Sequence, residues 1–352
     1  MQEKIDIASM FISEIEQLFA DILAKYGVKA EKYRAKQVFS WLSKGIADFS
    51  EMTNIPAALR NVLEETCYIS LPKVREKYVS QIDGTIKYLF EMHDGECVES
   101  VFMRYNHGNT ICISTQAGCR MGCSFCASTI AGLARHLTAS EILGQILAAE
   151  KDTGERVSNI VMMGIGEPLD NFDNSIRFLK LVNLPEGRNI GYRHISLSTC
   201  GLCDGIRKLA KENLPITLSV SLHAPTQEAR AAIMPVAKKW SIEELIKACH
   251  DYIAITGRRI SFEYAMIDGV NDTPEAASQL CKLLSGMLCH INLIPLNDVK
   301  EKNYRKSSAK RIEEFVSFLE KKGFTATVRR KLGSDINASC GQLRKQNALK
   351  EQ

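Results

Sequence analysis

Apolar residues recur at helical spacing in the first part of the chain and at strand spacing further on. ISEIEQLFADILAKYG (residues 12–27) and EKYRAKQVFSWLSKG (31–45) both have apolar positions on one helical face, and both end at a glycine. Residues 77–105 instead alternate apolar and polar positions around Asp83-Gly84, which predicts a β-hairpin. We therefore expect a small helical accessory domain with a linking hairpin over residues 1–95, and a second domain over residues 96–352.

From about residue 109 onward, short β-branched apolar runs alternate with helical segments, and the pattern repeats at least six times. Such alternation is typical of a parallel α/β sheet, either open or closed. We find neither the G-x-G-x-x-G fingerprint nor a P-loop. The repeats therefore favour a complete or partial (β/α) barrel. Its expected strands are TICIST, SNIVMMG, HISLST, ITLSVSL, RISFEYAM and HINLIPL.

In a (β/α) barrel the chemistry lies at the carboxyl ends of the strands, so the residues that follow each expected strand are candidates for the site. Polar residues and glycines do stand at these exits. Any one of them alone is equally consistent with an ordinary turn, and only their coincidence at one mouth indicates a site. They are a cysteine cluster after the first strand, Gly164 to Pro168, Ser198 to Gly201, Ser221 to His223, and Asn297.

The composition is that of an ordinary globular protein, with 45% hydrophobic and 24% charged residues among 352. No apolar run is long enough for a membrane span, and the start does not resemble a secretion signal, so we expect a cytoplasmic protein. In that compartment the twelve cysteines indicate metal or redox chemistry and not a disulfide framework. Residues 301–352 hold thirteen bases and six acids, which suits RNA but equally fits a solvated helix face.

Cys119, Cys123 and Cys126 follow the first strand in a C-x3-C-x2-C pattern. Thiolates are soft ligands suited to iron–sulfur clusters and zinc, but ferredoxin clusters and structural zinc sites use four ligands. Three cysteines on a [4Fe–4S] cluster leave one iron open, as in a radical S-adenosylmethionine (SAM) site. Glu167 would then serve the amine of SAM, and Gly166 would let the backbone approach it. The ribose, carboxylate and adenine would be contacted from Ser198, Ser221, Leu222, His223 and Asn297.

Cys112 and Cys340 stand apart from this cluster. Cys112 lies inside the first strand, and Cys340 lies in GSDINASCGQL after the basic Arg329 to Lys331. By default each is a buried structural thiol, but an unassigned pair can also do nucleophilic work and form a transient disulfide. Cys200 and Cys203 form a C-x2-C that fits either a redox pair or, more simply, a strand exit and a helix start.

The segments CISTQAGCRMGCSFCAST, MMGIGEPLDN, ISLSTCG, SVSLHAP, IDGVNDT and SDINASCGQL together resemble the RlmN/Cfr family of radical SAM RNA methyl synthases. The likeness runs over nearly the whole chain. It implies a partial (β/α) barrel of the radical SAM type with a helical accessory domain. It also implies an external one-electron reductant such as flavodoxin or ferredoxin. We expect a monomer.

The resemblance further implies a role for the separate cysteines. One SAM methylates Cys340, and a second is cleaved to a radical that takes hydrogen from the new methyl group. The methylene radical adds to the adenine, and Cys112 then attacks Cys340, releasing the methylated base as a disulfide forms. Glu99, in CVESVFMR, matches the family's candidate base for the ring proton.

Within this family, the implied products are adenosines methylated in 23S rRNA and tRNA. Glu167-Pro168 and DGTIKYLF look like the branch that methylates carbon 2 of one adenosine in the peptidyl-transferase centre and of one beside the tRNA anticodon. Asn337 and Ser339 depart from the commonest pattern without removing a reacting atom. Basic Arg329, Arg330 and Lys331 would hold phosphates. The alternatives are resistance-type methylation of carbon 8, and a non-enzymatic RNA-binding protein whose four clustered cysteines bind zinc.

Overall fold

The strand–helix repeats build one large sheet. The computed structural model describes residues 4–23, 25–28, 31–297 and 304–343, and within them ten strands form the central sheet in the order β14-β13-β12-β11-β10-β9-β6-β5-β4-β3. From β6 to β14 all neighbours in this order are parallel. The parallel strands are β6 (Asn109–Cys112), β9 (Val157–Met162), β10 (Ile195–Thr199), β11 (Thr217–Ser221), β12 (Ile260–Met266), β13 (Cys289–Pro295) and β14 (Ala326–Val328).

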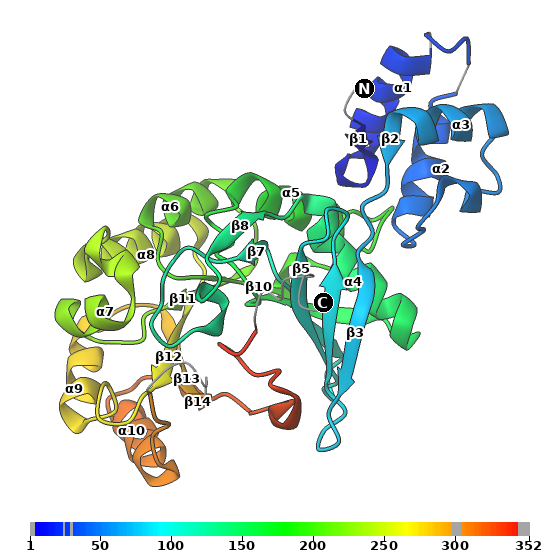
Figure 1. The fold of residues 1–352 in the computed structure, drawn as a ribbon. Helices are drawn as coiled ribbons and strands as arrows, with labels where there is room; N and C mark the ends of the chain where they lie inside the picture. The colour runs from blue at the N-terminus through cyan, green and yellow to red at the C-terminus, as the bar shows by residue number, and fades with distance from the viewer. Residues whose placement is uncertain (1–3, 24, 29–30, 298–303, 344–352) are drawn as a thin grey trace.

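This sheet is an open, partial barrel, because β14 and β3 are its edges in the described part of the chain. Figure 1 shows the helices along its outer face and the C-terminal segment passing across its open side. The predicted fold class is confirmed. The outer helices are α4 (Ala139–Thr153), α5 (Phe172–Asn183), α6 (Cys203–Glu212), α7 (Gln227–Ile233), α8 (Ile242–Thr256), α9 (Pro274–Leu283) and α10 (Ala309–Lys321).

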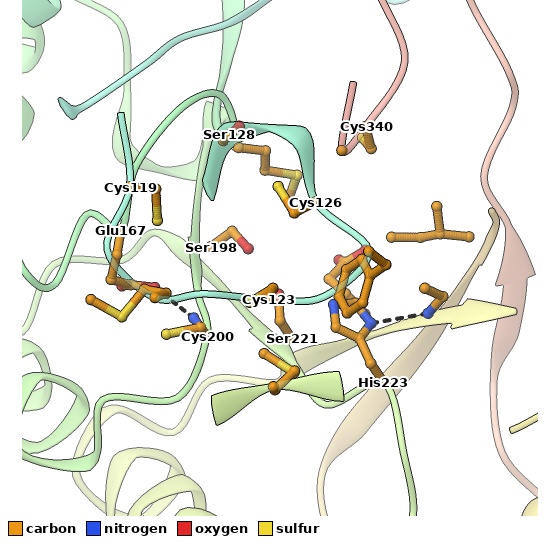
Figure 2. A pocket seen from close by; sticks show the side chains of 18 of the residues that line it. Cys119, Cys123, Cys126, Ser128, Glu167, Ser198, Cys200, Ser221, His223 and Cys340 are labelled. Carbon is orange, nitrogen blue, oxygen red and sulfur yellow. Dashed lines mark hydrogen bonds between the residues drawn. The ribbon is translucent and has the colours of Figure 1, made fainter. Parts of the chain in front are cut away.

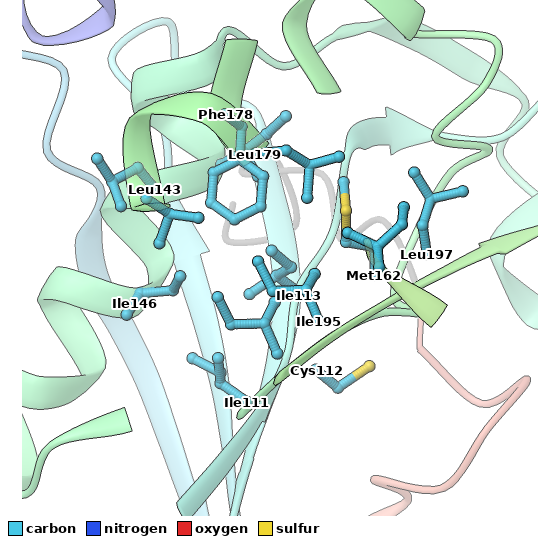
Figure 3. Packing of buried hydrophobic residues seen from close by; sticks show 14 of the residues in the cluster. Ile111, Cys112, Ile113, Leu143, Ile146, Met162, Phe178, Leu179, Ile195 and Leu197 are labelled. Atoms are coloured by element: carbon cyan, nitrogen blue, oxygen red, sulfur yellow. The ribbon is translucent and has the colours of Figure 1, made fainter. Parts of the chain in front are cut away.

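Hydrophobic packing between the sheet and these helices fixes which side chains face the barrel interior. In β6, Ile111 and the following Ile113 are fully buried and point toward α4, where Leu143 and Ile146 meet them (Figure 3). Cys112 lies between them and points to the opposite face (Figure 3), as the two-residue period of a strand requires. Burial of the isoleucines on the outer side therefore turns the Cys112 thiol inward.

The predicted hairpin extends the same sheet. Strands β3 (Lys73–Val79), β4 (Ile86–Glu91) and β5 (Cys97–Met103) are antiparallel neighbours, and β5 pairs with β6. The turn between β3 and β4 lies at Asp83-Gly84, where Gly84 has a φ of 70°. The proposed boundary between residues 95 and 96 falls between two adjacent strands of this sheet and stays a prediction.

The N-terminal residues fold as a separate helical layer. Helices α1 (Ile12–Leu23), α2 (Tyr33–Leu42) and α3 (Ala57–Thr66) pack around a shared apolar core, and β1 (Ile5–Asp6) pairs with β2 (Cys67–Tyr68). This layer is held to the barrel by the ion pair of Glu14 with Arg177 (2.6 Å). Within the described residues, no helix has the length and apolar character needed to cross a bilayer.

Candidate active site

The loop with the three clustered cysteines is held by a short antiparallel ribbon at the mouth of the barrel. Strands β7 (Gln116–Gly118) and β8 (Leu133–His136) flank it, and the Cys119 N–H donates to the Gly132 carbonyl at 2.9 Å. A side chain at residue 118 would place its Cβ 1.8 Å from that carbonyl oxygen, so this position requires Gly118, whose φ is +82°. The ribbon thereby fixes where the loop begins and ends.

Cys119, Cys123 and Cys126 line one cavity, which we call the cluster cavity, together with residues from the strand exits (Figure 2). Its empty space, counted together with the open solvent at its mouth, is about 1010 Å³. Burial raises the pKa of Cys119 to about 12 and the pKa of Cys123 further still. Bound metal would replace these protons, because only thiolates ligate.

The donor set fits a cluster better than a single ion. No group of three or more His, Cys, Asp or Glu side chains in the described residues is arranged to hold one metal ion. A cubane does not need such convergence, since its cysteines ligate separate irons. Cys112 lines a different cavity from these three cysteines, so the structure does not assemble the four-cysteine zinc site of the alternative reading.

The Gly166-Glu167 turn lies beside the cysteines. The Glu167 carboxylate is buried and accepts hydrogen bonds from the backbone N–H groups of Cys200 (2.6 Å) and Leu169 (3.0 Å). Burial raises the pKa of Glu167, and these donors oppose the rise. Each carboxylate oxygen keeps a lone pair for another donor, such as an amine. Gly166 has a φ of +108°, and a Cβ there would meet the Gln116 side chain at 2.7 Å, so packing against Gln116 already requires a glycine.

The other predicted contacts lie at the strand exits as expected, with one exception. Ser198, Ser221, His223 and Asn297 all line the cluster cavity. Leu222 does not line it, because its side chain is fully buried in the hydrophobic core. Its backbone N–H donates to the Glu263 carbonyl and its carbonyl accepts from Ala224. Leu222 follows the end of β11 at Ser221, and His223 has a φ of 58°, so in this turn Leu222 enters the core while Ser221 and His223 line the cavity.

His223 presents a defined hydrogen-bond donor. Its Nδ1 accepts from the Ala265 backbone N–H at 3.0 Å (dashed in Figure 2), and its ring meets Phe125 edge-on at 4.9 Å between centroids. Burial lowers the pKa of His223 to about 3, so the ring is neutral near pH 7. Because an N–H can only donate, Nδ1 is unprotonated and Nε2 carries the ring proton.

Cys340 and Cys112, far apart in sequence, both line a second cavity, the cysteine-pair cavity, of about 770 Å³. Cys340 also lines the cluster cavity, on the side of Cys126 and Ser128 in Figure 2. Burial, and secondarily the neighbouring Cys340, raise the pKa of Cys112 to about 12. The Cys340 segment is fixed to the cysteine loop, since the Ala127 N–H donates to the Gly341 carbonyl at 2.8 Å. Cys340 therefore stands where the cavities meet.

Arg329 contacts this thiol, which sequence reasoning did not anticipate. We predicted a phosphate contact for it, yet Nη1 donates to Cys340 Sγ at 2.9 Å and Nη2 lies 3.7 Å from Glu263 Oε2. Asn297 Nδ2 also donates to the Cys340 carbonyl at 3.1 Å. Nothing in the local sequence separates Arg329 from its basic neighbours. Arg330 and Lys331 are exposed at the rim of the cysteine-pair cavity.

Glu99 lies on β5 and is almost fully buried, paired with Lys87 at 3.1 Å between Oε1 and Nζ. Glu99 itself lines neither cavity, but Val101, two residues further on the same strand face, lines the cysteine-pair cavity. Its candidate role as a base stays a prediction.

Cys203 begins α6, as the simpler reading of the C-x2-C pattern expected, and Cys200 lines the cluster cavity.

Comparisons with known proteins agree with this geometry. The model of the Radical SAM superfamily matches residues 113–281, which hold the cysteine loop and most of the strand exits. The crystal structure of a radical SAM methyltransferase from Sphaerobacter thermophilus has a TM-score of 0.90 and 41% identity, covering 96% of this chain and 99% of that one. The fold is that of a radical SAM enzyme, a class that uses a [4Fe–4S] cluster and SAM.

Further matches identify the family within the radical SAM class. The model of the ribosomal RNA large subunit methyltransferase N-terminal domain matches residues 8–69. Proteins named "Probable dual-specificity RNA methyltransferase RlmN" are similar over most of their length. The one from Clostridium tetani is 56% identical over 90% of this chain and 91% of its own, and that from Alkaliphilus oremlandii is 54% identical over 98% and 99%. The chain belongs to the RlmN family of radical SAM RNA methyltransferases.

This membership confirms the resemblance drawn from the motifs. It also makes the chain a SAM-dependent RNA methyltransferase, so the non-enzymatic zinc protein is not a fitting alternative.

Proposed function

We propose that this enzyme methylates carbon 2 of an adenosine, both in the peptidyl-transferase centre of 23S rRNA and beside the anticodon of tRNA. The observation that carries the proposal is the position of Cys340 between the cluster cavity and the cysteine-pair cavity. A methyl group on Cys340 Sγ can be received on one side and presented to a base on the other. The name of the relatives, dual-specificity RNA methyltransferase, supports two RNA substrates.

Cys119, Cys123 and Cys126 would hold the [4Fe–4S] cluster, which supplies the electron that cleaves SAM. Glu167 would accept a hydrogen bond from the SAM amine, and Gly166 would leave room for SAM beside the turn. Ser198, Ser221 and Asn297 offer hydrogen-bonding groups from the surrounding exits. The His223 Nε2–H adds a donor whose direction is fixed by the Ala265 contact.

In the first half of the reaction, the Cys340 thiolate would attack the methyl carbon of one SAM and displace S-adenosylhomocysteine, with Arg329 stabilising the sulfur anion before transfer. The second SAM is the source of the radical that removes one hydrogen atom from this methyl group. Two SAM molecules are thus consumed per turnover. An external one-electron reductant such as flavodoxin or ferredoxin would supply the electron.

In the second half, the adenine must be unstacked from the RNA to enter the cysteine-pair cavity. The methylene radical on Cys340 would add to carbon 2, and the adduct would then lose its ring proton to a base and one electron to the oxidised cluster. Glu99 stays our candidate, acting from the strand face that borders the cavity. Cys112, as a thiolate, would then attack Cys340 Sγ, so that a disulfide forms as the carbon–sulfur bond breaks. The methylene carbon keeps the electron pair of that bond and takes up a proton, which completes the methyl group of the released base. We also propose that the enzyme acts as a monomer in the cytoplasm.

Nucleoside mass spectrometry of tRNA and of a 23S rRNA fragment treated with enzyme, SAM and reductant tests the proposal. We expect 2-methyladenosine from both RNAs. With Cys112→Ala we expect a covalent protein–RNA adduct to accumulate, because the displacing thiol is missing. Detection of 8-methyladenosine instead would contradict the carbon 2 assignment, and free methylated RNA from Cys112→Ala would contradict the resolving role of Cys112.

A further inference from the structure

Arg230 is a buried cation directly behind the cysteine loop. It lies in α7 and is 0% exposed. The end of the same helix is joined to the loop, because the Ile233 carbonyl accepts from the Ser124 N–H at 2.9 Å. Arg230 Nη2 donates to the carbonyls of Cys200 (2.6 Å) and Ser221 (3.3 Å), both of which belong to residues lining the cluster cavity. The guanidinium thus hydrogen-bonds the backbone of two strand exits that line that cavity.

The part of the chain that the structure describes supplies no ion-pair partner for this guanidinium. Among the described residues Arg230 forms no ion pair with a carboxylate, and its Nε and Nη1 atoms are buried without any hydrogen-bond partner there. Arginine stays charged in proteins, and an isolated charge away from water is costly. The two hydrogen bonds to carbonyl oxygens offset only part of the cost of burying this charge. A compensating negative charge is therefore expected close by.

The ionisable side chains that act most strongly on the charge of Arg230 are cysteines. Burial lowers the pKa of Arg230, and the charges of Cys200 and Cys123 on their ionisation are the first influences that oppose this. Cys123 is one of the candidate cluster ligands, and Cys200 lines the same cavity. An oxidised [4Fe–4S] core carries two positive charges, so three thiolates leave the assembly with one net negative charge. Uptake of one electron doubles this negative charge.

We propose that Arg230 is the buried counter-charge of the iron–sulfur cluster and makes the cluster easier to reduce. The inference rests on the proposed ligation by Cys119, Cys123 and Cys126. A fixed cation stabilises the doubly negative reduced assembly more than the singly negative oxidised one, and the low dielectric around Arg230 keeps this difference large. Arg230 is a positioning residue in this account, because it acts on SAM cleavage only through the cluster. The electron itself comes from the external one-electron reductant.

A matched pair of variants separates charge from hydrogen bonding. Arg230→Lys keeps the positive charge, and Arg230→Gln keeps amide donors for the carbonyls of Cys200 and Ser221 without the charge. The cluster potential would be measured on the reconstituted full-length enzyme, without RNA, by a redox titration followed by electron paramagnetic resonance. We expect Arg230→Gln to have a more negative midpoint potential than wild type and Arg230→Lys to lie near wild type. Each tenfold loss in the ratio of reduced to oxidised cluster corresponds to 59 mV.

Equal potentials in wild type and Arg230→Gln would overturn the proposal, because a merely structural arginine would leave the potential unchanged. If Arg230→Gln binds no cluster, the iron content of the two variants is compared instead. A cluster retained in Arg230→Lys supports a requirement for the positive charge, and loss of the cluster from both variants overturns the proposal. Unfolding of the cluster-free proteins is a second readout. There we expect Arg230→Gln to be at least as stable as wild type, since an uncompensated charge is gone, and a clear loss of stability would contradict us.

The redox titration of the Arg230 variants does not depend on the RNA chemistry. A wild-type chain that binds no cluster would overturn both this inference and the proposed ligation. A cluster with the expected charge dependence but no 2-methyladenosine would leave the inference standing and reject the proposed product.

Discussion

Cys340 is oriented from two sides, by Arg329 at its sulfur and by Asn297 at its carbonyl. A hydrogen bond from a charged donor contributes about 1.5–3 kcal/mol. Arg329→Met should therefore slow methyl transfer from SAM to Cys340 by roughly 10- to 100-fold. Single-turnover mass spectrometry of the Cys340 peptide measures this rate. Arg330→Met is the control and should be near wild type, and an unchanged rate in Arg329→Met would contradict the role of Arg329.

Cys112 should react only slowly at neutral pH, because its buried thiol has a pKa of about 12 and the thiolate is the nucleophile. The thiolate fraction, and with it alkylation of Cys112 by iodoacetamide, should rise about tenfold per pH unit between pH 7 and 9. Peptide mass spectrometry separates Cys112 from the other cysteines. A rate that levels off below pH 9 would mean that the thiol is already largely ionised there.

Residue types and spacing predicted most of the site but not its supporting charges. Cys119, Cys123 and Cys126 follow from a local spacing, and the strand exits follow from the barrel rule. The contacts of Arg329 and Arg230 were missed because tertiary packing sets them. Arg329 is one of three consecutive basic residues, and Arg230 lies in an ordinary helical segment, so the local sequence does not distinguish either. The sequence did not indicate that the Leu222 side chain enters the core, because β11 ends at Ser221 and the loop backbone sets the directions beyond it. A contact between Leu222 and SAM stays a prediction.

At the scale of elements, the β3–β4 hairpin holds the segment that carries Cys340. Asp335 accepts from Ser80 Oγ (2.7 Å) and from the Gln81 N–H (2.9 Å), and Asp83 accepts from the Gly333 N–H (2.9 Å). Each carboxylate thus belongs to one segment and binds the other. We infer that this reciprocal contact keeps Cys340 at the junction of the cavities.

Asp335→Ala should loosen this contact, because it removes the acceptor of both hydrogen bonds. Amide hydrogen exchange in residues 333–343 should become several-fold faster while the rest of the sheet is unchanged. Methyl occupancy on Cys340 should fall with it. Glu76→Gln, on β3 of the same hairpin, is the matched control. Equal exchange in wild type and Asp335→Ala would show that other contacts hold the segment.

At the scale of the whole molecule, the exposed Arg330 and Lys331 border the cysteine-pair cavity. If both contact phosphates of the RNA, the double variant Arg330→Ala/Lys331→Ala should bind a tRNA anticodon stem-loop more weakly. The slope of log affinity against log salt should flatten by about 1.4, at roughly 0.7 per contact on single-stranded nucleic acid. Fluorescence anisotropy at several salt concentrations measures it. Lys310→Ala/Lys321→Ala on α10 should leave the slope unchanged, and equal slopes in both pairs would place the RNA elsewhere.

The overall architecture was largely predictable, because the six strand–helix repeats and the hairpin are long, regular patterns. The short strands β7, β8 and β14 were not, since three or four residues give too little periodicity to recognise. The joining of the hairpin to the parallel strands was also not predictable, because β5 pairs with β6 through hydrogen bonds that leave no sequence signal.

The most direct test of the account is mass spectrometry of the Cys340 peptide from enzyme purified out of SAM-replete cells. We predict one added methyl group on Cys340 in the wild type and none when Cys123 is replaced by alanine. An unmodified Cys340 in a protein with an intact cluster and SAM available would contradict the methyl-carrier mechanism.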